Sequence, residues 1–133
     1  MDLVIDANII FAALIKESYS YHFLFEQQFQ LFAPEYLLEE IETHSEELLQ
    51  KTQRTPKEFF EVLEILKRMI TFVPLEKLVP YLEQAEEISP DKYDLAYFAL
   101  ALKLNCAIWS NDKEMKEKQN KIKVYSTHEL IQL

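Results

Sequence analysis

MDLVIDANIIFA, residues 1–12, contains an apolar run that stops at Asp6 and then resumes. This pattern predicts a buried strand followed by a buried helix. Asp6 is then expected at the carboxyl end of the strand, the edge at which open α/β sheets bind their ligands. The alternative is that Asp6 only caps the helix. Further carboxylates at the same edge would favour a binding site.

The composition indicates one domain. The chain has 133 residues, 49% of them hydrophobic, and a formal net charge of −9. This length predicts a single domain over residues 1–133. No signal peptide is recognisable, and no apolar run approaches the roughly 20 residues of a membrane span, so we expect a cytoplasmic protein without membrane contact. The charge argues against broad affinity for nucleic acids but allows a nuclease, because bound metal reverses the local charge.

The sequence contains no glycine and a single cysteine. Neither a dinucleotide-binding fingerprint nor a P-loop can form without glycine, because both bring the backbone close to phosphate. Cys106 cannot form an internal disulfide and precedes a predicted buried strand, so we interpret it as a small hydrophobic residue. The three histidines lie far apart in the sequence and lack the spacing of metal ligands.

Short apolar runs alternate with helical patterns along the chain. Strands are expected at residues 3–5, 30–33, 70–73, 107–109 and 121–125. Helices are expected at residues 8–15, 18–27, 35–51, 56–69, 80–87, 90–104 and 113–119, with a last helix capped by Ser126 or Thr127. The alternation predicts an α/β fold with a parallel sheet and right-handed crossovers.

Four prolines are expected at helix starts, and Pro34 is the one that precedes the helix predicted at 35–51. Pro56 follows the predicted cap Thr55, Pro90 follows the predicted cap Ser89, and Pro80 begins a short amphipathic helix.

Basic residues gather at two places. Lys51, Arg54 and Lys57 lie near the turn between two predicted helices, where they form either a phosphate clamp at the lip of a cleft or an ordinary charged loop. Five lysines between Lys113 and Lys123 are more typical of a solvated rim.

Acidic residues recur where strands end and helices begin. Asp6 ends the first predicted strand, Asp112 follows the strand at 107–109, and Asp94, with Asp91, lies at a helix start. Carboxylates that meet without cationic partners repel one another, and a bound metal ion removes that repulsion. Oxygen ligands select Mg²⁺ or Mn²⁺, and the lack of clustered histidines argues against zinc.

The helix predicted at residues 35–51 supplies one more acid. Glu40 flanks its apolar stripe, whereas Glu39 points further away from the stripe. Glu40 is therefore the better candidate for reaching inward, although Glu42 flanks the other side and stays an alternative.

Four segments, in order and over essentially the whole chain, resemble the signatures of the PIN domain family. They are VIDAN at 4–8, LLEEI at 37–41, DKYD at 91–94 before an alanine-rich helix, and IWSNDK at 108–113. The resemblance implies a three-layer α/β/α fold around a central parallel five-stranded sheet, and a Mg²⁺- or Mn²⁺-dependent endoribonuclease. The pattern is most similar to single-domain prokaryotic PIN proteins, including VapC-type toxins, which pair with a small antitoxin and are often homodimers.

The resemblance also implies roles for individual residues. The catalytic acids would be Asp6, Glu40, Asp94 and Asp112. The metal ligands would be Asp6, Asp91, Asp94 and Asp112. Asn8 and Ser110 would orient the site, and the RNA phosphates would be positioned by Lys51, Arg54 and Lys113.

Two other functions compete with the ribonuclease. One is a catalytically inactive PIN scaffold that binds a partner protein. The other is phosphotransfer, because residues 6–8 faintly resemble the Asp-x-Asp loop of haloacid dehalogenase-like phosphatases, although the second acid is missing.

Overall fold

A five-stranded parallel sheet forms the centre of the protein, in the order β3-β2-β1-β4-β5. The computed structural model describes residues 1–26 and 29–133. The strands are β1 (Asp2–Ile5), β2 (Gln30–Pro34), β3 (Ile70–Val73), β4 (Ala107–Trp109) and β5 (Val124–Tyr125). The predicted parallel five-stranded sheet is confirmed. Pro34, predicted to begin a helix, is instead the last residue of β2, because it still pairs with Val73 of β3.

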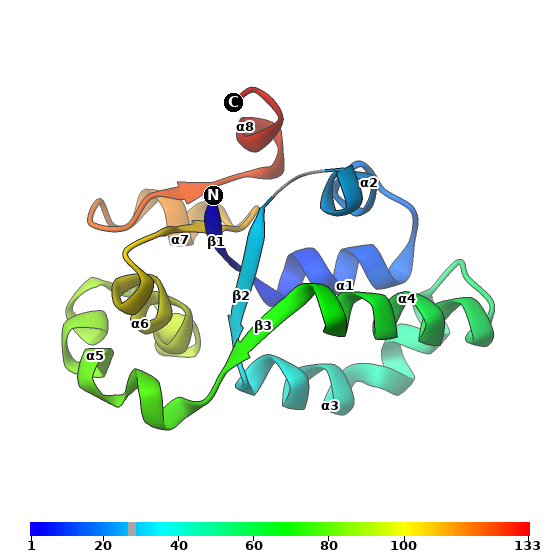
Figure 1. Ribbon diagram of the computed structural model, residues 1–133, viewed down its shortest axis with the longest axis horizontal. Helices are drawn as coiled ribbons and strands as arrows, with labels where there is room; N and C mark the ends of the chain where they lie inside the picture. Colours follow the sequence, from blue (N-terminus) through cyan, green and yellow to red (C-terminus); the bar gives the residue numbers. More distant parts are fainter. Residues whose placement is uncertain (27–28) are drawn as a thin grey trace.

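Helices cover the sheet on both faces. They are α1 (Ala7–Ile15), α2 (Tyr19–Glu26), α3 (Tyr36–Lys51), α4 (Pro56–Met69), α5 (Leu75–Ile88), α6 (Leu95–Leu104), α7 (Lys113–Glu117) and α8 (Thr127–Ile131), with a short 3₁₀ helix η1 (Lys92–Asp94) before α6. In Figure 1 the sheet separates α5 and α6 from α1, α3 and α4. This is the expected three-layer α/β/α arrangement. The predicted end of the second helix at Gln27 lies outside the described residues.

The central strand is buried on both faces. Leu3, Val4 and Ile5 of β1 are fully buried, because β1 lies between β2 and β4 and helices cover both faces of the sheet. Trp109 at the end of β4 is also fully buried, and its indole nitrogen donates a 2.9 Å hydrogen bond to Thr127 Oγ1. Packing in the apolar core therefore determines where the carboxyl ends of β1 and β4 lie.

The predicted start of α4 is confirmed in detail. The Thr55 hydroxyl accepts a hydrogen bond from the Glu58 backbone amide, and the Glu58 carboxylate accepts one from the Thr55 amide. Pro56 is the first helical residue. This reciprocal capping satisfies two amides that helix formation leaves without partners.

The prediction for α5 is wrong at its start. The helix begins at Leu75, with Pro74 at the cap position, and Pro80 lies inside it. Proline inside a helix removes one backbone hydrogen bond. Leu78, before Pro80, and Ala85, after it, are both buried in the core. The free energy of burying these side chains outweighs the lost hydrogen bond.

The segment before α6 also differs from the prediction. Ser89 ends α5 rather than capping the next helix, and its hydroxyl donates to the Asp91 carbonyl oxygen. Asp91 is the residue that caps, because its carboxylate accepts a hydrogen bond from the Tyr93 amide and starts η1. The α-helix itself begins only at Leu95.

The helix predicted at 113–119 ends at Glu117, and the strand predicted at 121–125 contains only Val124 and Tyr125. Gln119 explains both differences. Its side-chain amide donates to the Met115 and Ile122 carbonyls, and its side-chain oxygen accepts from the amides of Lys121 and Ile122. These contacts hold the connection as a loop.

Asn105 closes α6 in the left-handed conformation, with φ of 51°, and no other residue within 1–26 and 29–133 has a positive φ. This is the position where glycine would be expected, and asparagine tolerates it. None of the helices in those ranges is long and apolar enough to traverse a bilayer.

Candidate active site

Asp6 lies at the carboxyl end of β1, and its side chain is 5% exposed. It occupies the cap position of α1, yet its side chain makes no capping hydrogen bond. Instead, Asp6 Oδ2 accepts a 2.7 Å hydrogen bond from Ser110 Oγ. The Asp6 amide donates to the Trp109 carbonyl at 2.9 Å, which ties the ends of β1 and β4 together. Ser110 thus links Asp6 to the next strand.

Asp112 follows β4 and lies near the same edge. Its backbone amide donates to Ser110 Oγ at 3.0 Å, so the Ser110 hydroxyl bonds both aspartates. Asp112 Oδ1 accepts a 2.9 Å hydrogen bond from the Glu114 amide and thereby caps α7. Within the described residues, Asp112 Oδ2 has no hydrogen-bond partner.

Asp94 and Asp91 lie in the segment between α5 and α6. Asp94 is half-buried, and within the described residues its side chain has neither a hydrogen bond nor an ion pair. Asp91 is exposed, and one of its oxygens is used by the Tyr93 amide. Of the two, Asp94 has the carboxylate that is free to bind.

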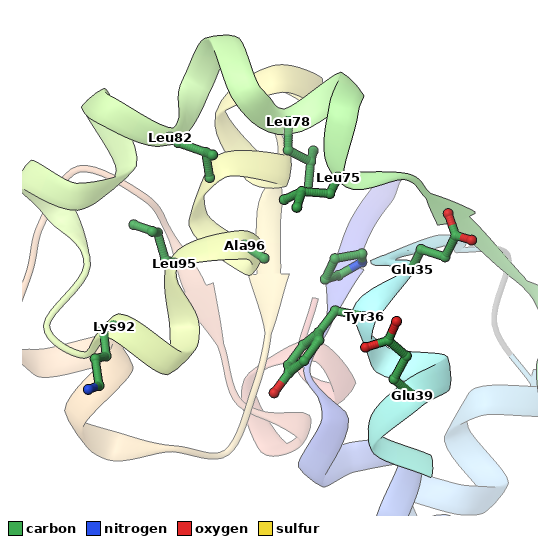
Figure 2. Close-up of a pocket in the computed structure, with 10 residues that line it drawn as sticks. Glu35, Tyr36, Glu39, Leu75, Leu78, Leu82, Lys92, Leu95 and Ala96 are labelled. Carbon is green, nitrogen blue, oxygen red and sulfur yellow. The ribbon is translucent and has the colours of Figure 1, made fainter. Parts of the chain in front are cut away.

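Of the three candidate glutamates on α3, which are Glu39, Glu40 and Glu42, Glu40 is the one whose charge acts on the aspartates. It is half-buried, and Glu40 Oε1 accepts a 3.4 Å hydrogen bond from the Tyr97 hydroxyl. Glu39 is exposed and lines a separate cavity, drawn in Figure 2. Glu42 is exposed beside α4. The geometry therefore favours Glu40.

The carboxylates raise one another's pKa. Burial, followed by the charges of Asp6, Asp112, Asp91 and Glu40, raises the pKa of Asp94 to about 6. Burial raises the pKa of Asp6, and the Ser110 hydrogen bond and the amides of Ala7 and Asn8 partly offset this rise. Burial and the charge of Asp6 raise the pKa of Glu40, against the hydrogen bond from Tyr97. These acids therefore interact as one cluster.

No lysine or arginine in the described ranges forms an ion pair with Asp6, Glu40, Asp94 or Asp112. An all-oxygen donor set without cationic partners matches hard divalent cations. Among residues 1–26 and 29–133, however, no three acid, histidine or cysteine side chains already surround a possible ion. Binding would draw the carboxylates closer together than they lie here.

The other predicted residues lie around this cluster. Asn8 is exposed in the first turn of α1, and Lys113 is exposed immediately after Asp112. Lys51 is exposed on α3 and pairs with Glu47 at 2.7 Å.

Arg54 has a different environment from the one predicted. Its side chain is 6% exposed, its Nη2 donates to the Ala13 carbonyl at 3.0 Å, and its guanidinium lies 4.5 Å from the centre of the Tyr21 ring. Nη1 lies 3.7 Å from Glu17. The guanidinium is thus used inside the protein, which argues against a role in binding phosphate.

Cys106 is half-buried, and burial raises the pKa of its thiol to about 11. The thiol stays protonated at neutral pH, which agrees with the inert role predicted for it.

A cavity of about 410 Å³ lies between α3, α5 and the start of α6 (Figure 2). Apolar side chains of α5 and α6, among them Leu75, Leu78 and Leu95, line it opposite Tyr36. Its walls come from the segments that also carry Glu40 and Asp94.

Sequence reasoning missed Tyr97. Its hydroxyl faces the acids, although its ring is part of the buried core. The sequence feature that could have indicated Tyr97 is its position three residues after Asp94, because residues with this spacing lie on the same side of a helix. The apolar helix around it indicated only core packing.

Comparisons with known proteins agree with this fold. A family model described as PIN domain matches residues 4–128. VapBC2 from Rickettsia felis, in a structure bound to a DNA fragment from its promoter, is similar with a TM-score of 0.71 and 14% identity, covering 95% of this chain and 98% of that chain. At this identity the likeness concerns the fold. No curated protein matches the sequence. Because the family model matches nearly its whole length, the chain belongs to the PIN domain family.

Proposed function

We propose that the protein is a metal-dependent endoribonuclease that cleaves RNA phosphodiester bonds, through a single domain over residues 1–133. The observation that carries this proposal is the cluster of Asp6, Glu40, Asp94 and Asp112, whose charges act on one another without a cationic partner in the described residues. Such a cluster is costly for a fold to retain unless a cation binds it. Membership of the PIN domain family, which includes nucleases, supports the same activity.

Asp6, Asp94 and Asp112 would hold Mg²⁺ or Mn²⁺, with Asp91 at the exposed side. The ion would lower the pKa of the attacking water and stabilise the negative charge that develops on the phosphoryl oxygens. Glu40 Oε2, which has no hydrogen bond in the described residues, would accept a proton from that water. Asn8 and Ser110 would orient the acids.

Exposed lysines would position the RNA. Lys113 lies next to Asp112, and Lys51 lies on the same helix as Glu40. Their ammonium groups would bind RNA phosphates, Lys113 close to the acids and Lys51 at the far end of α3. Arg54 is left out of this set because its guanidinium is buried.

We further propose that the protein is the toxin of a toxin–antitoxin pair, that it forms a homodimer and that it acts in the cytoplasm. The similarity of its fold to the VapBC2 complex of Rickettsia felis supports the antitoxin partner. Co-purification with the product of an adjacent reading frame tests the antitoxin, and light scattering after size-exclusion chromatography tests the dimer.

Cleavage of single-stranded RNA with Mn²⁺ tests the activity. Asp6→Asn and Asp94→Asn should each reduce cleavage by at least 100-fold while the protein remains folded. Asp2→Asn is the matched control, because Asp2 lies at the opposite end of β1. Cleavage by both site variants at the wild-type rate would rule the proposal out.

The second candidate function is an inactive PIN scaffold that binds a protein. It is favoured by the lack, in the described residues, of three side chains already grouped around an ion, and by the apolar cavity between α3 and α5. Calorimetric titration with Mn²⁺ separates the two functions. A nuclease should bind the ion at micromolar to low-millimolar concentration, whereas a scaffold need not.

A further inference from the structure

Tyr97 belongs to α6 and is 2% exposed, among the largest fully buried or nearly buried side chains of the protein. It lies one helical turn after Asp94, so its side chain extends on the same side of the chain as that carboxylate. The ring is held by the core, which leaves the hydroxyl in a fixed place at the boundary between core and acidic cluster.

The hydroxyl of Tyr97 faces carboxylates. It donates to Glu40 Oε1 at 3.4 Å, and the charges of Glu40, Asp6 and Asp94 all contribute to raising the pKa of the phenol. The phenol therefore stays protonated at every working pH and acts as a donor. Within the described residues, the bond from Tyr97 is the one side-chain hydrogen bond that Glu40 accepts, and Glu40 Oε2 has no partner there.

A glutamate side chain has several rotatable bonds, and fixing them costs conformational entropy. In this cluster Glu40 is also repelled by Asp6. Both effects favour conformations in which Glu40 turns away from the aspartates. A hydrogen bond from a donor that is itself immobilised by packing counteracts them.

We propose that Tyr97 is a positioning residue, which holds the Glu40 carboxylate toward the aspartates through its hydroxyl and so prepares the site for a divalent cation. This inference rests on the proposed function, because it assigns Tyr97 a role in the same metal site. A purely structural account competes with it: the ring fills the core, and the hydroxyl bonds the nearest acceptor. The two accounts differ in what removal of the hydroxyl does to metal affinity.

Tyr97→Phe removes the hydroxyl and keeps the ring. Calorimetric titration with Mn²⁺ should show affinity about tenfold weaker than that of the wild type, because a Glu40 carboxylate that turns away no longer adds its negative charge beside the ligands Asp6, Asp94 and Asp112. Tyr81→Phe is the matched control, because Tyr81 is a half-buried tyrosine of α5 whose ring lies beside Lys103. It should bind Mn²⁺ with wild-type affinity. Thermal melting without metal verifies that both variants are folded.

A double-mutant cycle tests whether the effect runs through Glu40. In a Glu40→Ala background the hydroxyl has no carboxylate to hold, so adding Tyr97→Phe should change Mn²⁺ affinity less than twofold. An equal loss in both backgrounds would show that Tyr97 acts by another route and would overturn the inference.

Two failures are distinguishable. If the wild type binds Mn²⁺ and Tyr97→Phe binds it equally well, the inference is wrong and the proposed nuclease stands. If the wild type binds no Mn²⁺ up to millimolar concentration, the proposed function fails, and the positioning role fails with it.

Discussion

Ser110 Oγ donates a 2.7 Å hydrogen bond to Asp6 Oδ2, and this bond connects residues at the carboxyl ends of the neighbouring strands β1 and β4. The same oxygen accepts the Asp112 amide. One hydroxyl therefore sets the position of two acids that are 106 residues apart in the sequence, counted from 6 to 112.

Replacing Ser110 with alanine should raise the pKa of Asp6, because the Ser110 hydrogen bond lowers it in the wild type. Metal binding requires the ionised carboxylate. Relative to the wild type, the variant should therefore lose more Mn²⁺ affinity at about pH 5.5, where a raised pKa leaves less of Asp6 ionised, than at about pH 8. The variant should also lose about 1–2 kcal/mol of stability. Titration calorimetry at the two pH values measures the difference. Ser45→Ala, which removes a hydroxyl that donates to the Glu42 carbonyl, is the control. Identical profiles for both variants would contradict the prediction.

The metal-free protein should become less stable as the pH rises from 3.8 to about 6. The pKa of Asp94 is raised from 3.8 to about 6, so between these values the folded state binds more protons than the unfolded state. The free energy of unfolding then falls with rising pH across this window. Because Asp94 is half-buried and screened by solvent, the loss should be about 1 kcal/mol.

Urea unfolding at several pH values, with a chelator present, measures this effect. Asp94→Asn should flatten the decrease, whereas Asp2→Asn should retain it. A wild type and an Asp94→Asn variant with parallel pH dependence would show that Asp94 is not the responsible group.

Arg54 should contribute to stability rather than to RNA binding. Arg54→Ala removes a hydrogen bond to the Ala13 carbonyl and a guanidinium that lies over Tyr21, and should cost about 2–3 kcal/mol in urea unfolding. Lys51→Ala, at an exposed ion pair, should change stability by less than about 0.5 kcal/mol. Equal stability of the two variants would contradict this assignment.

Lys113 should bind RNA phosphate. Lys113→Ala should reduce the slope of log affinity against log salt concentration by about 0.7, the value for one contact to single-stranded nucleic acid. Fluorescence anisotropy with a labelled RNA in Ca²⁺ measures the slope. Lys121→Ala is the matched control, because Lys121 precedes β5 and so lies toward the opposite edge of the parallel sheet. A slope unchanged by Lys113→Ala would remove this lysine from the proposed interface.

The sheet could be predicted because its strands are short apolar runs in a regular alternation with helices. The run at 3–5 shows this most clearly, since a central parallel strand leaves no polar alternation. The start of α5 could not be predicted in the same way. Pro80 has the local chemistry of a helix start, and only the packing of Leu78 in the core moves the boundary to Leu75.

The candidate site shows the same division. The positions of Asp6 and Asp112 could be predicted, because each follows a predicted strand and parallel strands end at the same edge of the sheet. Periodicity narrowed the choice on α3 to Glu40 without excluding Glu42. The burial of Arg54 depends on the side chains of α1 and α2 that surround it, Ala13 and Tyr21, and no local pattern reports such long-range contacts.

Asn105 is the single left-handed residue in the described chain, and the sequence has no glycine at all. An unfolded chain without glycine samples fewer backbone conformations, so it loses less entropy when it folds, by about 0.4–1 kcal/mol for each glycine replaced at a compatible position. That gain is independent of pH and of ions. The lower entropy of the unfolded chain therefore helps to offset the repulsion among the acids while no cation is bound.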